Sequence, residues 1–320
     1  MAFVRLKKKE DGEYYYYVES YRVGEKVFSR NLKYLGKKKP TQEEVWGLEQ
    51  EFTEKKIQKY IRSKRKFDSY VVSKDLLEKT DRIKEDFFNN LGSLSKEGKK
   101  QLISRFKTGY TYHSCSIEGN TLSRAEVDLV INKNQSIDGK RLYELQEVIN
   151  HKKAIEYMMS EDEDLSELFI KKLHEVLMKN ILEYKEEDPE FVIGGYRVDM
   201  RFIEGADFVP VPHMMVPFEM KDLIKFYKKN KYSIHPIELA SDFHMKFIVI
   251  HPFSDGNGRI ARLLMNFILD RSGFPMIDIS VKNREEYIKA LASGNDGELT
   301  KFICSELKNY CDEIFMNIRE

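Results

Sequence analysis

Cysteine is scarce in this sequence: three residues in 320, Cys115, Cys304 and Cys311. They cannot form a disulfide framework, and none belongs to a C-x-x-C pair typical of zinc or redox sites. We expect reduced thiols, with Cys304 and Cys311 on one packed face of a final helix. His174 precedes a glutamate but lacks the second histidine of a metalloprotease helix, so a zinc hydrolase is not expected.

Long apolar runs are also absent. No stretch approaches 18 consecutive apolar residues, and the first ten residues hold no hydrophobic run that a secretory signal would need. With 41% apolar residues the chain can bury a sizeable core, as one domain or as a main domain with a smaller companion. We therefore expect a cytoplasmic globular protein with no membrane partner.

Positive charge gathers at the front of the chain. Residues 1–66 hold 18 Lys or Arg against 10 Asp or Glu, a net charge of +8, while the whole chain carries +1. The asymmetry predicts a separate basic module with nucleic acid or an acidic protein as its partner. Lysine runs are more often solvated surface, and that interpretation is favoured for Lys7 to Lys9 and Lys37 to Lys39.

Residues 1–40 alternate in the manner of strands, with turn signals at Asp11-Gly12 and Gly24-Glu25. The pattern predicts a small basic β-meander of three strands. Its tyrosine run, Tyr14 to Tyr17, favours packing across a small sheet, although tyrosines of this kind also stack on bases.

From Thr41 onward the pattern is mainly helical. T41-Q-E-E44 is a capping box, in which the two side chains bond each other's free backbone N–H groups, and it opens a charged linker helix within residues 41–72. A main domain is expected over 73–300 and a C-terminal helix over 301–320. Helices are expected at about 73–91, 96–118, 140–160, 165–180 and 217–229, with another opened by the capping box S123-R-A-E126.

Residues 195–212 interrupt the helical pattern. They alternate apolar and polar residues around a turn near Glu204 to Asp207, which predicts a β-hairpin. An isolated hairpin is marginal in water and exposes its edge to any extended peptide that arrives. The fold class is therefore mainly α, with one hairpin and the front meander.

Residues 251–262 read H-P-F-S-D-G-N-G-R-I-A-R. A mostly apolar helix is predicted over 235–250 and a second over 259–273, which Gly273 and Pro275 end. The twelve residues thus lie on a loop between two buried helices and finish at a helix N-terminus.

This loop carries the residue types of a phosphate site. Free backbone N–H groups and the positive end of the helix dipole converge on Gly256, Asn257 and Gly258, where glycine permits close approach of an anion. Arg259 and Arg262 are three residues apart on one helix face and suit further phosphate oxygens. The pattern predicts a polyphosphate ligand.

Two more residues of the loop point to nucleotide chemistry. Mg²⁺, which accompanies nucleotides, prefers one or two carboxylates together with phosphate oxygens, and Asp255 is the predicted ligand. His251 has an unperturbed pKa near 6.5, which suits it to accept a proton from an attacking hydroxyl.

The stretch resembles the signature of the Fic family, H-P-F-x-[D/E]-G-N-G-R-x-x-R, at every specified position from His251 to Arg262. The resemblance covers roughly residues 75–300 and implies a Fic-type helical bundle in which the 195–212 hairpin is the flap that binds the target protein. Members with the complete motif are typically adenylyltransferases, which transfer AMP from ATP to a Ser, Thr or Tyr hydroxyl. The kinase-like Doc branch has lysine in place of the last loop glycine, so Gly258 and Arg262 favour AMP transfer.

The resemblance implies a role for each residue of the motif. His251 would deprotonate the target hydroxyl and Asp255 would hold Mg²⁺. The backbone of residues 256–258, with Asn257, would hold the phosphates and the ribose side of ATP, while Arg259 and Arg262 would bind the outer phosphates. The implied targets include the enzyme itself.

A second motif stands upstream, S114-C-S-I-E118-G119. Ser114 and Glu118 share a helix face and Gly119 fits a helix C-cap, which alone is typical of a helix end with a solvated glutamate. The segment also resembles the family's inhibitory motif, [S/T]-x-x-x-E-[G/N], on a helix at about 96–119. The resemblance implies that Glu118 pairs with Arg262 and keeps ATP from binding productively.

Other functions stay open at this point. In some relatives the same glutamate positions a water that removes AMP, so a de-AMPylating enzyme that uses Glu118 is one alternative. A nucleotide-sensing regulator that binds nucleic acid is another. His174 and His244 lie in apolar helical patterns and are predicted to be buried core residues, and a homodimer is one option for the oligomeric state.

Overall fold

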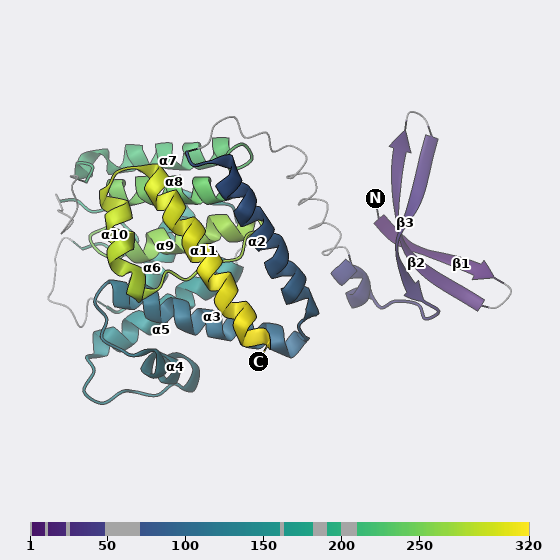
Figure 1. Ribbon diagram of the computed structural model, residues 1–320, viewed down its shortest axis with the longest axis horizontal. Helices are drawn as coiled ribbons and strands as arrows, with labels where there is room; N and C mark the ends of the chain where they lie inside the picture. Colours follow the sequence, from purple (N-terminus) through teal and green to yellow (C-terminus); the bar gives the residue numbers. More distant parts are fainter. Residues whose placement is uncertain are drawn as a thin grey trace. The chain divides into compact units, whose positions relative to one another are not determined.

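The structure, a computed structural model, describes residues 2–9, 12–23, 26–48, 71–160, 163–181, 191–199 and 210–319. The chain separates into two compact units, Met1–Arg65 and Lys66–Glu320, so the boundary falls within the predicted linker (Figure 1). No helix in the described part of the chain combines the length and apolar composition that a membrane crossing needs.

The first unit contains the predicted meander. Strands β1 (Ala2–Lys9), β2 (Gly12–Val23) and β3 (Lys26–Gly36) form an antiparallel sheet in the order β1-β2-β3. The register of β2 against β3 shifts between Tyr15 and Tyr16 and again between Tyr17 and Val18, as in a β-bulge. The three-stranded prediction is confirmed, while residues 10–11 and 24–25 of its turns lie outside the described residues.

The linker helix begins as its capping box predicts. Residues 42–48 are helical, the Thr41 N–H donates to Glu44 Oε2 at 2.8 Å, and the Glu44 N–H donates to Thr41 Oγ1 at 3.2 Å. Residues 49–70, the rest of the predicted linker, lie outside the described residues.

The second unit is helical, and each helix predicted in it is present. Ser123 and Glu126 form both bonds of the predicted capping box. The helices are α2 (Lys74–Ser93), α3 (Lys96–Ile117), α4 (Arg124–Lys133), α5 (Leu142–Ser160), α6 (Glu167–Met178), α7 (Val216–Asn230), α8 (Pro236–Ile250), α9 (Asn257–Arg271), α10 (Arg284–Ala292) and α11 (Asp296–Arg319), with short 3-10 turns η2 (His213–Met215) and η3 (Val281–Asn283).

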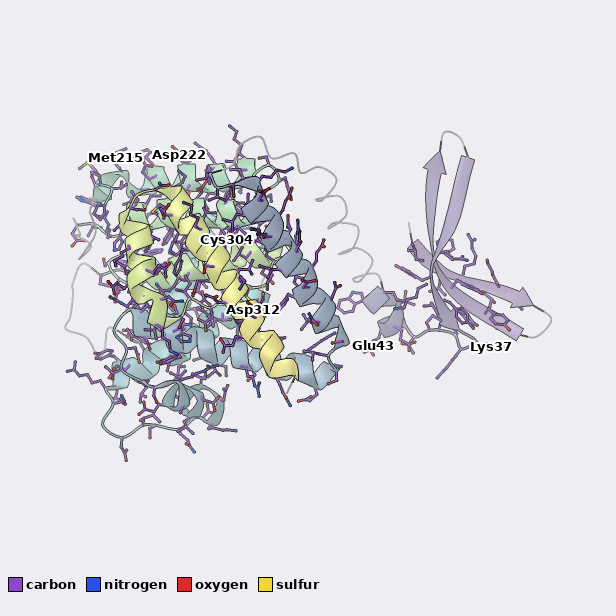
Figure 2. The ribbon with its side chains drawn as sticks, in the orientation of Figure 1. Lys37, Glu43, Met215, Asp222, Cys304 and Asp312 are labelled. Atoms are coloured by element: carbon purple, nitrogen blue, oxygen red, sulfur yellow. The ribbon has the colours of Figure 1, made fainter. Side chains whose placement is uncertain are left out.

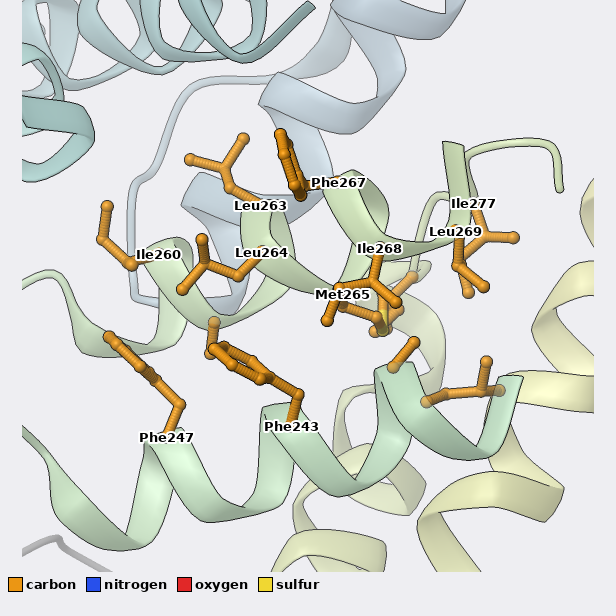
Figure 3. Packing of buried hydrophobic residues seen from close by; sticks show 14 of the residues in the cluster. Phe243, Phe247, Ile260, Leu263, Leu264, Met265, Phe267, Ile268, Leu269 and Ile277 are labelled. Carbon is orange, nitrogen blue, oxygen red and sulfur yellow. The ribbon is translucent and has the colours of Figure 1, made fainter. Parts of the chain in front are cut away.

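Helix α9 lies within the core, and each of its residues from Arg259 to Leu269 is buried. Figure 3 shows Phe243 and Phe247 of α8 beside Ile260 and Leu264 of α9, and all four side chains are fully buried. Their packing fixes the angle at which α8 delivers the loop that joins it to α9. The sequence motif is thus mounted between two rigid helices.

The C-terminal helix differs in length from its prediction. Helix α11 begins at Asp296 instead of 301, because Asn295 Oδ1 accepts the Gly297 N–H at 2.9 Å and so starts the helix earlier. Cys304, labelled on α11 in Figure 2, and Cys311 are both buried, as expected for one packed face. Helix α10, which periodicity did not indicate, precedes α11.

Most of the predicted hairpin, residues 200–209, lies outside the described residues. Its described flanks, 195–199 and 210–212, are not assigned as strands. The Arg197 N–H donates to the Pro252 carbonyl at 2.9 Å and the Val211 N–H donates to the Val249 carbonyl at 3.2 Å. Both flanks are therefore fixed to the end of α8, beside the motif.

Candidate active site

His251 ends α8 and begins the loop. Its backbone adopts the left-handed conformation (φ 50°, ψ 60°), uncommon for a residue with a Cβ, and its N–H donates to the Phe247 carbonyl at 2.9 Å. Burial, followed by the positive charge of Arg197, lowers the pKa of His251 to about 4. The imidazole is therefore neutral at neutral pH, the state in which it can accept a proton.

Arg197 binds the backbone around His251. Its Nε donates to the His251 carbonyl at 2.7 Å, Nη1 donates to the Asp199 carbonyl at 2.6 Å, and Nη2 donates to the Val211 carbonyl. The residue is 3% exposed. One guanidinium thus joins both flanks of the predicted flap to the residue that carries the candidate base.

Asn257 holds the loop in shape. Its side-chain amide donates to the Phe253 carbonyl at 2.7 Å, and its side-chain oxygen accepts the Phe253 N–H at 2.9 Å. This reciprocal pair explains why an amide stands here, since a carboxylate can only accept and a hydroxyl would have to donate and accept at a single atom. The side chain of Asn257 serves the loop, and its backbone N–H belongs to the first turn of α9.

His174 supports the same loop from α6. Its ring stacks on Phe253 with 3.8 Å between centroids and 5° between planes. Nδ1 accepts the Gly194 N–H at 2.9 Å, so the ring proton is on Nε2, which lies 3.2 Å from the Asp255 carbonyl and donates to it. Burial lowers the pKa of His174 to about 4. The prediction that His174 is a buried core residue is confirmed, and the residues that it packs against are Phe253 and Asp255 of the motif.

The N-terminus of α9 has the backbone geometry of the predicted anion site. Gly256 has a φ of 78°, a conformation that favours glycine, and the first backbone N–H groups of α9 follow it. A Cβ at position 258 would collide with Glu118 Oε1 and lie 3.2 Å from Arg262 Nη1. The Glu118 carboxylate therefore occupies the space above the second loop glycine.

Arg262 is enclosed by the end of α3. Its Nη2 donates to Glu118 Oε1 at 2.7 Å and to the Ser114 carbonyl at 2.8 Å, while its Nε donates to Ser114 Oγ at 3.0 Å. Arg262 is 1% exposed, and the side chain of Glu118 is 36% exposed. The Tyr287 ring, whose hydroxyl bonds buried His244 at 2.8 Å, lies 5.8 Å from the guanidinium.

The end of α3 explains how Glu118 reaches Arg262. Glu118 is the C-cap of α3, and Gly119 follows with a φ of 97°, which turns the chain sharply. The turn buries Asn120, whose amide donates to Glu147 Oε2 on α5 at 3.0 Å. The turn thus contacts two parts of the site: Glu118 bonds Arg262, and Asn120 bonds Glu147.

Arg259 is held by two carboxylates. Its Nη1 donates to Glu147 Oε1 at 3.0 Å, and its Nη2 donates to Asp255 Oδ1 at 3.3 Å. The arginine side chain is 2% exposed and that of Glu147 is 8% exposed. Burying this cation requires such a partner, because an uncompensated charge in the interior is costly.

Asp255 is the one acidic residue of the loop sequence, and 40% of its side chain is accessible. Its Oδ1 accepts the Gly256 N–H at 2.6 Å. A single partly exposed carboxylate beside an anion cradle fits Mg²⁺, which takes most of its ligands from phosphate and water. Within the described residues there is no cluster of three or more side chains that would hold a metal without a nucleotide.

The structure brings every predicted site residue together at the α8–α9 loop: Ser114, Glu118, His251, Asp255, Gly256, Asn257, Gly258, Arg259 and Arg262. Sequence reasoning missed Arg197, Asn120 and Glu147. Arg197 stands in an alternating segment where an arginine is normally exposed, and Glu147 lies within a mixed polar helix, so neither carries a local signal. Asn120 follows directly on the inhibitory motif, and that position was the available clue.

The described second unit is mainly helical, and its loop between α8 and α9 presents a neutral histidine and two glycines at a helix N-terminus. Residues 164–269 match the model of the Fic/DOC family.

Relatives support this assignment along much of the chain. Protein adenylyltransferase fic-1 of Caenorhabditis elegans is 34% identical over 200 residues, which are 61% of this chain and 38% of the relative. Protein adenylyltransferase Fic of Nematostella vectensis is 31% identical over 238 residues, 72% of this chain and 53% of the relative. The chain spans about half or less of the length of these relatives.

The fold is similar to solved Fic structures. Fic-1 (residues 134 to 508) from C. elegans superposes with a TM-score of 0.67 at 26% identity, over 76% of this chain and 72% of that one. A Fic domain containing signaling protein from Bacteroides thetaiotaomicron superposes with a TM-score of 0.64 at 25% identity, over 74% of this chain and 94% of that one.

Proposed function

We propose that this protein is an adenylyltransferase that transfers AMP from ATP to a Ser, Thr or Tyr hydroxyl of a target protein and of itself. One observation carries the proposal: neutral His251 shares its loop with a helix N-terminus whose anion site is occupied by the Glu118 carboxylate, which Arg262 holds there. A site built for packing alone would not hold a carboxylate against a helix N-terminus and a buried arginine. The names of the relatives support the same reaction.

His251 is the proposed base. The target hydroxyl oxygen forms a bond to the α-phosphorus of ATP, its proton passes to the neutral imidazole, and the bond from the α-phosphorus to the bridging oxygen breaks to release pyrophosphate. Arg197 fixes the His251 backbone through the 2.7 Å bond and so sets where the ring stands. Burial keeps the imidazole unprotonated before the reaction.

The anion cradle is the proposed phosphate site. Backbone N–H groups of residues 256–258 face the phosphates at the positive end of α9, and Asn257 keeps the loop in the shape that presents them. Arg262 is proposed to bind the outer phosphates once Glu118 leaves. For Arg259 we propose a positioning role beside the predicted phosphate contact, since Glu147 and Asp255 each accept one of the five N–H groups of its guanidinium.

Asp255 is the proposed ligand of Mg²⁺. A magnesium ion bound there with ATP would neutralise charge on the phosphate oxygens during transfer. Arg259, 3.3 Å from Asp255 Oδ1, orients that carboxylate. The ion needs no further protein cage, because phosphate and water complete its coordination.

The Glu118 to Arg262 contact is the proposed lock. Glu118 takes the guanidinium that the outer phosphates need and fills the space above Gly258. Keeping the competent form near 1% requires a bias of only about 2.7 kcal/mol. The 2.7 Å charge-assisted contact to the buried arginine supplies part of that bias, and the carboxylate adds to it by occupying the space above Gly258 that a phosphate would enter.

Target recognition is proposed for the region next to the described flanks 195–199 and 210–212. Their attachment to Pro252 and Val249 would bring a peptide bound along this segment close to His251.

A homodimer and a cytoplasmic location stay predictions.

The test is transfer of label from α-labelled ATP with Mg²⁺ to the purified full-length protein. We expect Glu118→Gly to label itself up to about 100-fold more than wild type. Adding His251→Ala to Glu118→Gly should lower labelling by at least about 100-fold. Glu97→Gly, which removes an exposed glutamate from the other end of α3, is the matched control and should label like wild type.

The outcomes separate the parts of the proposal. Equal labelling by wild type and Glu118→Gly would contradict the lock, and no label in any variant would contradict the transfer. Release of AMP from prelabelled protein by wild type, but not by Glu118→Gly, would favour the de-AMPylating alternative, in which Glu118 positions water.

A further inference from the structure

The sheet of the first unit has two unlike faces. Arg5 lies opposite Tyr16 across β1 and β2, and Tyr16 lies opposite Tyr34 across β2 and β3. Lys7 lies opposite Tyr14 in the same register. Residues directly opposite in an antiparallel pair share a face, so these five side chains lie on one side of the sheet.

The other face is built differently. Tyr17 lies opposite Val4 and Lys33, and it is 1% exposed. On the first face, by contrast, Lys7 is exposed, Tyr34 is 52% exposed and Arg5 is half-buried. Each side of the sheet thus has a buried centre, Tyr17 on one and Val18, opposite Phe3, on the other, and the side of Val18 presents cations and rings to solvent around that centre.

The cations on the exposed side are ordered by the rings. Lys7 Nζ lies 5.1 Å from the centroid of Tyr16 and Lys37 Nζ lies 5.0 Å from that of Tyr14. Tyr34 contacts both rings, with centroids 5.1 Å from Tyr16 and 6.2 Å from Tyr14. Lys37 follows directly on the end of β3 (Figure 2). We call Arg5, Lys7, Tyr14, Tyr16, Tyr34 and Lys37 the basic-aromatic face.

We propose that the basic-aromatic face binds duplex DNA through its phosphates. Residues 1–40 hold 11 Lys or Arg against 5 Asp or Glu, a net charge of +6, which complements a polyanion. Cation–π contacts hold the two ammonium groups in place, so less side-chain entropy is lost when they meet phosphates. This binding goes beyond adenylyl transfer and does not depend on it.

The geometry favours a duplex over a single strand. Single-strand platforms offer open ring faces on which bases stack, whereas here Tyr14 and Tyr16 are covered by lysines and by Tyr34. Three strands spaced about 4.8 Å apart span roughly 10 Å, which suits the roughly 12 Å major groove of B-form DNA. The major groove of duplex RNA is too narrow for such a surface.

The experiment measures binding of the full-length protein to a fluorescent duplex DNA of mixed sequence by anisotropy. The test variant is Lys7→Ala/Lys37→Ala, which removes two charges from the basic-aromatic face. The matched control is Lys8→Ala/Lys33→Ala, which removes two exposed charges from outside that face. Circular dichroism checks that both variants remain folded.

At about 50 mM salt we expect the test variant to bind at least about tenfold more weakly than wild type, and the control less than about threefold more weakly. The slope of log affinity against log salt should fall by about 2 in the test variant, one for each lost phosphate contact. Equal weakening by the two variants would overturn the assignment to this face. Equal or tighter binding of single-stranded DNA, duplex RNA or a polyglutamate peptide would overturn the assignment to duplex DNA.

Discussion

Two arginines stand one turn apart on α9 and are buried to the same degree, yet their partners differ. Arg262 pairs with Glu118, which lies on the end of a helix and is 36% exposed. Arg259 pairs with Glu147, which lies within α5, is 8% exposed and is itself bonded by Asn120. One glutamate can leave its arginine by a side-chain rotation into solvent, and the other cannot.

The difference in exposure between Glu118 and Glu147 distinguishes a regulatory carboxylate from a structural one. A carboxylate that serves as a lock must be able to leave, so it belongs at a helix end where water can receive it. A carboxylate that positions a cation should stay, so it belongs inside a helix with its second oxygen satisfied. Both carboxylates are tied to the turn at Glu118 to Asn120, so the end of α3 contacts one arginine directly and the other through Glu147.

The largest expected effect concerns stability. Glu147→Gln should lower the free energy of unfolding by about 3 kcal/mol, because Arg259 loses the nearer and more buried of its two acidic partners. Glu118→Gln should lower it by about 1 kcal/mol or less, since that pair is partly solvated. Urea unfolding of each variant, followed by circular dichroism, gives both values.

A compensating variant distinguishes loss of charge from loss of packing. Glu147→Gln/Arg259→Met removes the stranded cation along with its partner, and it should recover part of the lost stability, since apolar replacements of a buried pair are often tolerated. If Glu118→Gln and Glu147→Gln destabilise the protein equally, the distinction between a regulatory Glu118 and a structural Glu147 is wrong.

The next effect concerns the space that Glu118 fills. Since a Cβ at position 258 would collide with Glu118 Oε1, Gly258→Ala should already displace the lock, and because the same Cβ faces the proposed phosphate site, each gain is measured against its own background. Glu118→Gly should then add less than about threefold to self-labelling in the Gly258→Ala background, against about 100-fold in wild type. The double-mutant cycle is read with α-labelled ATP. A full 100-fold gain in both backgrounds would show that the carboxylate acts from elsewhere.

Much of the fold was predictable because its signals are local. The capping boxes at Thr41 and Ser123 placed two helix starts, and strand alternation placed the meander. Helix α11 begins earlier than expected because Asn295 caps it, a contact that apolar periodicity does not report. Helix α10 has 9 residues, and although its buried residues Tyr287, Ala290 and Leu291 have helical spacing, they cover little more than one turn, which is too short for the periodicity to stand out.

The site was predictable for a different reason. The residues from His251 to Arg262 lie close together in the sequence, so a base, a metal ligand and a phosphate site could be predicted as one site before their geometry was known. Arg197 and Glu147 act across long separations in the chain, and nothing in their neighbours indicates that they meet the loop. Asn257 illustrates a further limit, because sequence alone assigned it to the ligand while its amide is bonded to Phe253.

The smallest effect is a pH profile, and it tests whether His251 is as enclosed in solution as its contacts indicate. In Glu118→Gly, kcat/KM for ATP should change by less than about 1.5-fold between about pH 8 and about pH 6, whereas a histidine with an ordinary pKa near 6.5 would lose about fourfold. The expected half-point is about 4, because burial and Arg197 lower the pKa of His251 and removal of Glu118 takes away a charge that raises it.

The unfolded chain binds the proton first as the pH falls through about 6.5, so stability also declines below that value. Circular dichroism at each pH therefore separates lost activity from lost fold. A half-point near 6.5 in the folded protein would mean that the loop opens to water once the lock is gone, and that Glu118 contributes to the enclosure of His251 as well as to the capture of Arg262.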